Sequence, residues 1–396
     1  MLLDSLNGRF LDQGELGRGG TGVVRRVYDQ HIERTVALKV VHRDLSAADR
    51  QRFADEARTT ALLEHPNILP VYDVFFDSSG DPYSFAMKLV EGGQFADVLS
   101  VPLEGGEEGL LERLAVLSKV CDALALAHSR GVIHRDVNPK NVMVGRFGEA
   151  YLTDWGLALR LEDVRDTDDA DCIGLSGTPC YMAPEQAEGR VHAIDPRTDV
   201  FALGATLYEI LVGRPPFEGS RFAEVLELAR RCEVRFPEVS QPSSSELRRI
   251  ALKALARDPD DRYGDVLEMK RDIEDFIRGG GWFPRVRFPA GATILSEGAE
   301  GDVAYILIEG RCEVFRIEAG ERRRIREVGP GEVFGEIALF TDTRRTADVR
   351  ALTDVSLLTV RRAALANALD RSPWMGAFVR AAAERFVELD SKERGR

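Results

Sequence analysis

The sequence contains few cysteines and few lysines for its length of 396 residues. Its five cysteines are odd in number, and no two are spaced as paired metal ligands would be. We therefore expect neither a disulfide scaffold nor a cysteine-bound metal, and we interpret the cysteines as reduced thiols in a cytoplasmic protein. Lysine occurs only seven times, so the position of each lysine is informative.

Long hydrophobic runs are also missing. No stretch approaches the ~20 consecutive apolar residues that a membrane helix needs, and residues 1–10 lack the basic start and apolar run of a signal peptide. We expect a protein that has no membrane partner and stays where it is made. With 44% hydrophobic and 30% charged residues, the chain is unlike disordered or collagen-like sequences.

Clustered positive charge is absent from the larger part of the chain. The formal net charge is -13; residues 1–283 contain 34 basic and 48 acidic residues, whereas residues 284–396 contain 19 basic and 18 acidic residues. Because nucleic acids are bound by clustered cations, we do not expect nucleic acid as a partner.

Three consecutive glycines, Gly279 to Gly281, mark a division of the chain. They follow an amphipathic helical pattern from Asp265 to Ile277, and three glycines in a row extend a helix only at a high conformational cost. We predict a first domain at 10–277, a linker at 278–283 and a second domain at 284–390.

The two predicted domains differ in their patterns. Upstream, short strand-like runs give way to long helical runs, such as the face from Leu110 to His128 that ends before Gly131. Downstream, apolar runs alternate with glycine turns, and a helix from about Arg361 closes the chain. The predicted fold class is α+β, with a small β-rich lobe and a helical lobe followed by a β-barrel or jelly-roll domain with a terminal helix.

A glycine-rich loop begins the first candidate site. Gly17, Gly19 and Gly22 precede the strand-like Val24. Glycines allow backbone N–H groups to approach phosphate oxygens, although an ordinary hairpin turn has the same appearance.

Lys39 follows this loop at strand spacing, and a buried ammonium group requires an anion. Ser46 and Asp49 predict the start of a helix that turns Glu56 inward. Glu56 can therefore hold Lys39 beside nucleotide phosphates, although a helical glutamate is often only a solvated charge.

A second group of polar residues follows the hydrophobic pair Val132 and Ile133. It contains Asp136 and Asn141, and Asp154 stands thirteen residues beyond Asn141. Phosphoryl transfer requires a carboxylate to orient the attacking hydroxyl and oxygen ligands to hold Mg²⁺. Asp136 suits the first task, and Asn141 and Asp154 suit the second.

These motifs, taken in order over residues 10–277, resemble those of the eukaryotic-type protein kinases. The Gly-Thr-Pro-Cys-Tyr form of the segment from Gly177 resembles serine/threonine kinases rather than tyrosine kinases. The resemblance implies a bilobal kinase fold, ATP and Mg²⁺ as cofactors, and protein substrates. It also implies that Thr178 contacts Asp136 and that Glu185 pairs with a buried Arg262.

The resemblance assigns roles to two sets of residues. The implied catalytic residues are Lys39, Glu56, Asp136, Asn141, Asp154 and Thr178. The implied ATP contacts are Leu16, Gly17, Gly19, Gly20, Gly22, Val24, Ala37, Lys39, Met87, Leu89 and Val90.

Two positions depart from the kinase pattern. Asn138 stands where serine/threonine kinases usually have a lysine that neutralises the transferring phosphate, and Lys140 is the next cation along the chain. Because this lysine is missing, a kinase that transfers phosphate slowly and a pseudokinase scaffold that binds ATP without transferring phosphate are alternatives to an ordinary active kinase. Trp155 replaces the usual phenylalanine, and we expect its large ring to be tolerated beneath the helix that carries Glu56.

An acidic segment, Glu162 to Asp171, lies between these motifs. It is compatible with a solvated loop. In the kinase family, however, the residue at the position of Arg135 tends to pair with a phosphate on this loop, and Thr167 and Ser176 are the candidate phosphorylation sites.

The last part of the chain contains a second candidate site. In the run from Phe334 to Ala347, Glu336 and Arg345 flank a short apolar turn at Ile337 to Leu339. An exposed ion pair is one interpretation, but a carboxylate and a guanidinium over small residues can also hold a ribose hydroxyl and a cyclic phosphate.

This run resembles the phosphate-binding cassette of cyclic-nucleotide-binding domains, and the likeness covers residues 284–390. It implies ligand contacts from Gly335, Glu336, Ala338, Arg345 and Thr346, with cyclic AMP or cyclic GMP as the ligand. A degenerate module that docks a protein is an alternative. Because no helix-turn-helix follows, a transcription factor is not expected.

We thus predict a serine/threonine kinase under cyclic-nucleotide control, with no expectation for its oligomeric state, its substrate or the sign of its regulation. The segment from Arg361 to Leu365 is similar to a pseudosubstrate of basophilic kinases, but the start of the closing helix is the simpler interpretation.

Overall fold

The computed structural model divides the chain into two compact units, the first of Met1–Ser240 and Leu247–Ile277 and the second of Gln241–Glu246 and Arg278–Arg396. The described residues are 8–42, 45–77, 80–101, 107–162, 176–237, 244–280, 285–318, 321–336, 338 and 344–361. Each unit is considered by itself.

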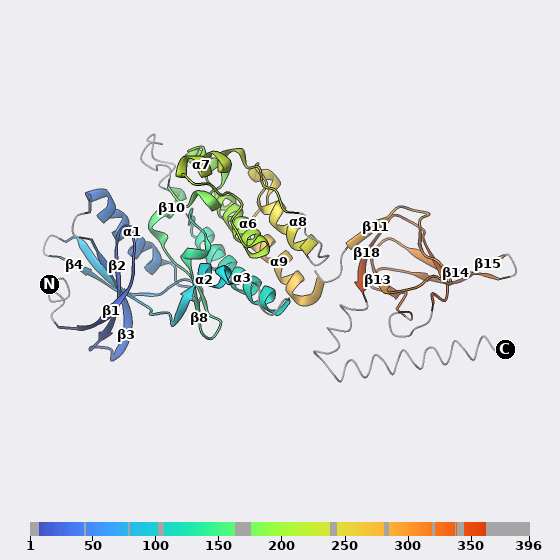
Figure 1. Cartoon of the computed structure of the whole chain (residues 1–396), viewed down its shortest axis with the longest axis horizontal. Coiled ribbons are helices and arrows are strands. Elements are labelled where there is room, and N and C mark those ends of the chain that lie inside the picture. The colour runs from blue at the N-terminus through green and yellow to red at the C-terminus, as the bar shows by residue number, and fades with distance from the viewer. Residues whose placement is uncertain are drawn as a thin grey trace. The chain divides into compact units, whose positions relative to one another are not determined.

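The first unit begins with an antiparallel sheet of five strands in the order β1-β2-β3-β5-β4 (Figure 1). The strands are β1 (Phe10–Arg18), β2 (Gly22–Asp29), β3 (Arg34–Val41), β4 (Val71–Phe76) and β5 (Pro82–Met87). Helix α1 (Ala47–Leu62) packs on this sheet through Phe53 and Ala57, which are buried against Val41 and Phe85. As predicted, the Ser46 hydroxyl accepts the backbone N–H of Asp49 and caps α1.

The helical lobe follows. Its helices are α2 (Phe95–Ser100), α3 (Glu107–Ser129), α5 (Pro184–Ala187), α6 (Pro196–Val212), α7 (Phe222–Arg231), α8 (Ser244–Ala254) and α9 (Val266–Asp275). Its short strands are β6 (Gly92–Gln94), β7 (Val132–Ile133), β8 (Val142–Gly145), β9 (Ala150–Leu152) and β10 (Leu159–Arg160), of which β6, β8 and β9 form one sheet and β7 pairs with β10. Helix α6 is buried along most of its length, so the lobe is built around it.

The end of the helical lobe differs slightly from the prediction. Helix α9 continues into a π-helical turn, Phe276–Gly280, so helical structure extends past Ile277 to include Gly279 and Gly280. The helix therefore ends in a single π turn that begins at Phe276 and includes the first two of the three glycines.

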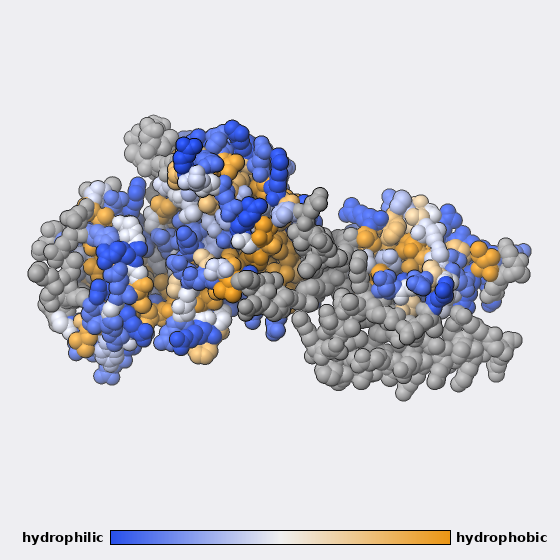
Figure 2. All heavy atoms as spheres, viewed as in Figure 1, coloured by the Kyte–Doolittle hydropathy of each residue, from blue (hydrophilic) through white to orange (hydrophobic). Residues whose placement is uncertain are grey.

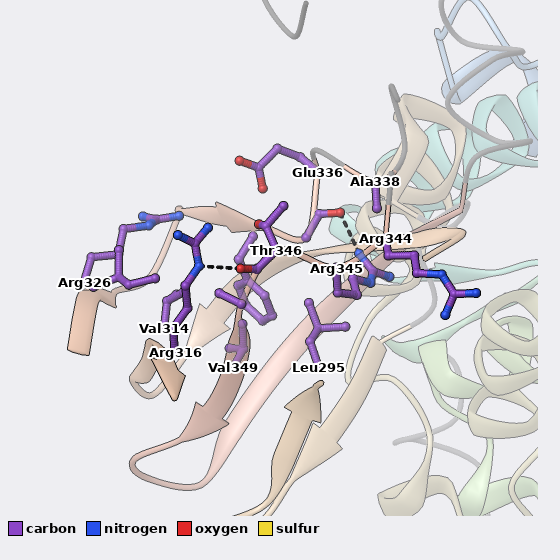
Figure 3. Close-up of a pocket in the computed structure, with 14 residues that line it drawn as sticks. Leu295, Val314, Arg316, Arg326, Glu336, Ala338, Arg344, Arg345, Thr346 and Val349 are labelled. Carbon is purple, nitrogen blue, oxygen red and sulfur yellow. Dashed lines mark hydrogen bonds between the residues drawn. The ribbon is translucent and has the colours of Figure 1, made fainter. Parts of the chain in front are cut away.

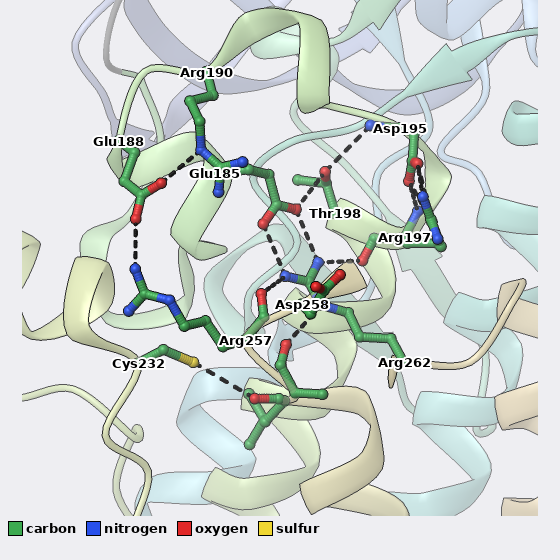
Figure 4. Close-up of polar contacts among 12 residues, drawn as sticks. Glu185, Glu188, Arg190, Asp195, Arg197, Thr198, Cys232, Arg257, Asp258 and Arg262 are labelled. Carbon is green, nitrogen blue, oxygen red and sulfur yellow. Dashed lines mark hydrogen bonds and ion pairs between the residues drawn. The ribbon is translucent and has the colours of Figure 1, made fainter. Parts of the chain in front are cut away.

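A buried polar network fixes the helical lobe from within (Figure 4). Arg262 donates to both carboxylate oxygens of Glu185 at 2.8 Å, and neither side chain is exposed. The guanidinium also donates to the carbonyls of Arg197 and Arg257, and the Thr198 hydroxyl donates to Glu185. The predicted pair is therefore present, with its polar atoms satisfied by neighbouring groups.

The second unit consists of two four-stranded sheets, β11-β18-β13-β16 and β12-β17-β14-β15. The strands are β11 (Arg285–Phe288), β12 (Thr293–Leu295), β13 (Val303–Glu309), β14 (Cys312–Glu318), β15 (Glu321–Val328), β16 (Val333–Phe334), β17 (Asp348–Ala351) and β18 (Val355–Arg361). Leu307, Cys312, Val328, Phe334 and Leu357 are buried in a common core. The predicted mixed α+β class, with a β-rich second unit, is confirmed.

One boundary in the second unit was wrong. Arg361 is the last residue of β18 and pairs with Val303 of β13, so it does not begin a helix. Strand pairing continues there because Val360 is still buried in the sheet. The remainder of the Arg361 to Leu365 segment and the predicted closing helix lie outside the described residues.

Within the described ranges, Cys121, Cys180, Cys232 and Cys312 are all free thiols, and no helix is long and apolar enough to cross a membrane. On the face shown in Figure 2, hydrophilic residues are spread over each unit, and smaller hydrophobic areas lie among these hydrophilic residues.

Candidate functional sites

The glycine-rich loop joins β1 to β2. Its turn is closed by a hydrogen bond from the Gly19 N–H to the Gly22 carbonyl at 2.9 Å. A Cβ atom at Gly22 would lie 2.3 Å from the Val40 carbonyl oxygen, whereas Gly17, Gly19 and Gly20 have nothing within 4 Å of that position. Strand packing thus requires Gly22, and the other three glycines face open space.

Four of the predicted ATP contacts form two cross-strand pairs in the sheet that carries the loop. Ala37 on β3 pairs with Met87 at the end of β5, and Val24 on β2 pairs with Lys39. After β5, Leu89 and Val90 are half-buried, and the Leu16 side chain on β1 is 48% exposed.

The predicted pair of Lys39 and Glu56 is present. Lys39 Nζ lies 2.6 Å from each carboxylate oxygen of Glu56, and the two side chains are 14% and 8% exposed. Burial raises the pKa of Glu56, which the charge of Lys39 opposes, while the nearby carboxylate of Asp154 raises it further. Helix α1 and strand β3 therefore hold an ion pair close to Asp154.

Asp136 is held by contacts from two sides. Its Oδ1 accepts the backbone N–H of Thr178 at 2.8 Å, and its Oδ2 accepts Nδ2 of Asn141 at 2.9 Å. The backbone N–H of Asp136 donates to Nδ1 of His134 at 3.2 Å. The predicted contact of Thr178 with Asp136 is thus made by the main chain of Thr178.

A buried carboxylate, that of Asp199, binds the backbone of the segment from His134 to Asn141. Asp199 on α6 accepts the backbone N–H groups of His134 and Arg135 at 2.9 Å, together with Nε2 of His128 at 2.8 Å. Burial opposes ionisation of Asp199, but these hydrogen bonds and the nearby histidines hold its pKa below the usual value. Only the fold brings these backbone groups to Asp199, because His134 and Arg135 lie 65 and 64 positions before it in the sequence.

The side-chain amide of Asn138 makes hydrogen bonds within the same segment, His134 to Asn141, and to Thr178. Its Oδ1 accepts the Lys140 backbone N–H at 3.0 Å, and its Nδ2 donates to the Asp136 carbonyl at 3.0 Å and to the Thr178 hydroxyl at 3.3 Å. The residue is buried, whereas Lys140 is exposed. No positive charge stands at position 138, and its amide is occupied by local contacts.

Asp154 has a left-handed backbone, with φ of 63°, and precedes the 3₁₀ turn Trp155–Leu157. The Trp155 ring is 1% exposed, and its centroid lies 4.6 Å from that of His134. A Cβ atom at Gly156 would lie 3.4 Å from a carboxylate oxygen of Asp154 and 3.6 Å from one of Glu56. The tryptophan is accommodated within the core, next to the group of carboxylates.

Arg135 also has a left-handed backbone, with φ of 64°. Its Nε donates to the Leu157 carbonyl at 2.6 Å, and burial lowers the pKa of the guanidinium to about 10. Thr167 and the segment 163–175 lie outside the described residues, whereas Ser176 lies within them.

The second unit contains a cavity of about 480 Å³ (Figure 3). Among the described residues it is lined by Leu295, Val314, Arg316, Ile325, Arg326, Phe334, Gly335, Glu336, Ala338, Arg344, Arg345, Thr346, Ala347 and Val349. All five predicted ligand contacts are among them. Of the predicted apolar turn only Ala338 is described; Ile337 and Leu339 lie outside the described residues.

Arg345 is the buried cation of this cavity. It is 7% exposed and donates through Nη1 to the Gly335 carbonyl at 2.7 Å and through Nη2 to the Val303 carbonyl at 2.6 Å. Its Nε has no hydrogen-bond partner among the described residues, and burial lowers the pKa of the guanidinium. The interpretation as an exposed surface pair with Glu336 is therefore wrong.

Two glycines make room for this guanidinium. A Cβ atom at Gly301 would lie 2.4 Å from Cζ of Arg345, and one at Gly335 would lie 2.8 Å from its Nη1. The sequence did not indicate Gly301. It also missed Arg316 and Arg326, although Arg316 stands two residues after Val314 on the same strand and so shares its face.

Two family models match this chain, one over each part. Residues 10–272 match the family model of the protein kinase domain, and residues 285–372 match the model of the cyclic nucleotide-binding domain.

Several curated proteins are similar to the first part of the chain. Serine/threonine-protein kinase PknD of Chlamydia caviae is 33% identical over 299 residues, which cover 68% of this chain and 31% of that protein. A probable serine/threonine-protein kinase of Streptomyces coelicolor, SCO3848, is 36% identical over 295 residues, covering 73% and 42%. Serine/threonine-protein kinase PknB of Mycobacterium leprae is 34% identical over 264 residues, covering 65% and 41%. The chain thus spans less than half the length of these relatives.

Proposed function

Because the chain belongs to the protein kinase family and carries a cyclic nucleotide-binding domain, we propose that it transfers the γ-phosphate of ATP to serine or threonine hydroxyls of proteins. We propose further that a cyclic nucleotide controls this activity. The corresponding domain bounds are 10–277 and 284–390, joined by a linker at 278–283.

The position of Asp136 carries the proposal for catalysis. Its carboxylate is fixed between the Thr178 N–H and the Asn141 amide, so it can orient an acceptor hydroxyl and receive its proton as the oxygen attacks phosphorus. In this proposal Asn141 and Asp154 hold Mg²⁺, which neutralises phosphate charge when it is bound.

Lys39 and the glycine-rich loop position the nucleotide in this proposal. The ammonium of Lys39, fixed by Glu56 at 2.6 Å, can reach phosphate oxygens beneath the loop. The open space beside Gly17, Gly19 and Gly20 allows backbone N–H groups to approach these oxygens closely. Leu16, Val24, Ala37 and Met87 would surround the adenine, and Leu89 and Val90 would meet its edge through their backbone.

A phosphate-transfer assay with radiolabelled ATP on the purified chain tests this function. Replacing Asp136 by Asn should lower transfer about 10²- to 10⁴-fold, because a positioned acid–base group contributes that much. ATP binding, measured by calorimetry, should persist. Equal transfer by both proteins would contradict the proposal.

Asn138 favours one alternative, an ATP-binding scaffold that transfers no phosphate. The buried amide supplies no charge for the transferring phosphate. If the site is slow rather than silent, Asn138→Lys should raise transfer by roughly 30- to 1000-fold, since such a charge contributes ~2 to 4 kcal/mol. Combining Asn138→Lys with Asp136→Asn is the matched control. A scaffold would give no transfer in any of the four proteins.

Arg345 carries the proposal for the second unit. A guanidinium that is 7% exposed and surrounded by carbonyls is suited to a cyclic phosphate. Glu336 would accept the ribose hydroxyl, and Gly335, Ala338 and Thr346 would complete the contacts. Calorimetry of the full chain with cyclic AMP and cyclic GMP tests binding, and autophosphorylation with and without each nucleotide tests control. Absence of heat with both nucleotides would favour the protein-docking alternative.

A further inference from the structure

His42 lies beside the tip of the glycine-rich loop, residues 19–22. It directly follows β3, which lies next to β2 in the sheet (Figure 1) and pairs with it up to Gly22 and Val41. The backbone N–H of His42 donates to the Thr21 carbonyl at 3.2 Å, and its ring Nε2 lies 3.1 Å from the Gly19 carbonyl oxygen. Because a carbonyl oxygen only accepts, Nε2 carries the proton in this contact. One residue thus holds the loop tip at two points.

The carbonyl and N–H groups of the loop tip are used differently. The carbonyls of Gly19 and Thr21 accept from His42. The carbonyl of Gly22 accepts from the Gly19 N–H at 2.9 Å. The N–H groups of Gly20 and Thr21, in contrast, have no hydrogen-bond partner in the part of the chain that the structure describes. Since phosphate oxygens bind N–H groups and are repelled by carbonyl oxygens, this arrangement suits a phosphate.

The glycines of the loop make it costly to order. Glycine loses more conformational freedom than any other residue when its backbone is fixed, and Gly17, Gly19 and Gly20 lie beside open space, so packing does not restrain them. A loop that becomes ordered only when its ligand binds lowers the affinity, whereas a contact that orders it beforehand recovers that affinity. The ring of His42 supplies such a contact at Gly19.

Resting on the proposed binding of ATP, we propose that His42 is a positioning residue for the ATP phosphates. It orders the glycine-rich loop before the nucleotide binds, so that the N–H groups of Gly20 and Thr21 are available to phosphate oxygens. In this role His42 acts on the phosphates through the loop and not on the adenine. Its loss should therefore weaken the binding of ATP and spare adenosine, which has no phosphate.

Calorimetry of the full chain with adenosine and with the β,γ-imido analogue of ATP, each with Mg²⁺, tests this role. In His42→Ala the affinity for the analogue should fall about 3- to 10-fold, which corresponds to about 0.6 to 1.4 kcal/mol, the usual net value of one hydrogen bond. The affinity for adenosine should equal that of the parent. An equal loss for both ligands would indicate a general defect of the lobe, and an unchanged affinity for the analogue would indicate an idle contact; either result overturns the proposal.

Two further substitutions separate the hydrogen bond from the bulk of the ring. His42→Gln restores an N–H donor on the side chain, so its ratio of analogue to adenosine affinity should return toward that of the parent. His42→Leu provides an apolar side chain without a donor, and its ratio should match that of His42→Ala. The leucine variant decides the question if His42→Ala fails to fold. Folded His42→Gln protein with the low ratio of the alanine variant would refute the role of the donor.

His31→Ala is the matched control. His31 is an exposed residue in the turn between β2 and β3, at the end of these strands remote from the glycine-rich loop, so its ratio should equal that of the parent. If the parent binds neither ligand, the proposed nucleotide binding is itself wrong and the inference falls with it. If the parent binds both ligands and His42→Ala leaves the ratio unchanged, nucleotide binding stands and only the role of His42 is refuted.

Discussion

Two buried arginines, one in each unit, are satisfied in different ways. Arg262 in the helical lobe faces a carboxylate, with both oxygens of Glu185 at 2.8 Å. Arg345 in the second unit donates to the carbonyl oxygens of Gly335 and Val303, and its Nε has no hydrogen-bond partner among the described residues. The first cation is neutralised by a hydrogen-bonded carboxylate, whereas the part of the chain that the structure describes offers no carboxylate within ion-pair distance of the second.

The difference between the two arginines separates a contribution to folding stability from a contribution to ligand binding. A buried pair with matched geometry is costly to break, because removing one partner leaves an uncompensated charge. A buried cation without a counter-charge costs the fold desolvation energy, and an anionic ligand recovers that energy on binding. Arg262 should therefore matter mostly for folding and Arg345 mostly for ligand affinity.

The largest expected effect is on the stability of the first unit. Arg262→Leu should lower the free energy of unfolding by about 3 to 5 kcal/mol, because Glu185 then remains buried and unpaired. Chemical denaturation followed by circular dichroism measures this loss. The double variant Glu185→Leu with Arg262→Leu should recover a substantial part of it; if it is no more stable than the single variant, the cost does not come from the unpaired charge.

The next effect is on the affinity of the second unit. Arg345→Leu should weaken cyclic-nucleotide binding by about 2 to 3 kcal/mol, or roughly 30- to 150-fold, since a charge-assisted contact to phosphate is lost. The same substitution should change the free energy of unfolding without ligand by less than about 1 kcal/mol, because a desolvated charge is removed together with two hydrogen bonds. A stability loss as large as that of Arg262→Leu would remove the contrast between the two arginines.

The smallest effect concerns two thiols, one in each unit. Burial raises the pKa of Cys121 to about 12 and that of Cys312 to about 11. Since the raised pKa keeps these thiols protonated, about one in a thousand Cys312 groups or fewer is a thiolate at pH 8. Iodoacetamide labelling followed by mass spectrometry should leave both unmodified in the native protein and modify both after denaturation. Rapid native labelling of one would show that its unit opens readily.

Local spacing was sufficient to predict several contacts. Strand spacing placed Lys39 behind the glycine-rich loop, and the cap at Ser46 fixed the start of α1, so the direction of Glu56 followed from helical periodicity. Glu185 and Arg262 could be paired only through the family resemblance, because 77 positions separate them in the sequence.

Other features could not be predicted, because they depend on which strands pair and on which distant residues the fold brings together. Ile325 and Arg326 both line the cavity although they are consecutive, because the register of β15 shifts by one residue at Ile325, opposite Val314 and Phe315. The burial of Arg345 depends on Gly301, a residue that only the folded turn brings beside it. Arg361 was assigned to a helix because local pattern does not record that β18 pairs with β13 at that point.

Trp155 gives the first unit an optical reporter of its own. The indole ring directly follows Asp154 and is sealed from water at 1% exposure, and the chain has only two other tryptophans. Any rearrangement of this turn when nucleotide binds would alter the surroundings of the ring and hence its intrinsic emission. The spectrum of the unlabelled protein, corrected with a Trp155→Phe variant, can therefore follow the turn after Asp154 in real time.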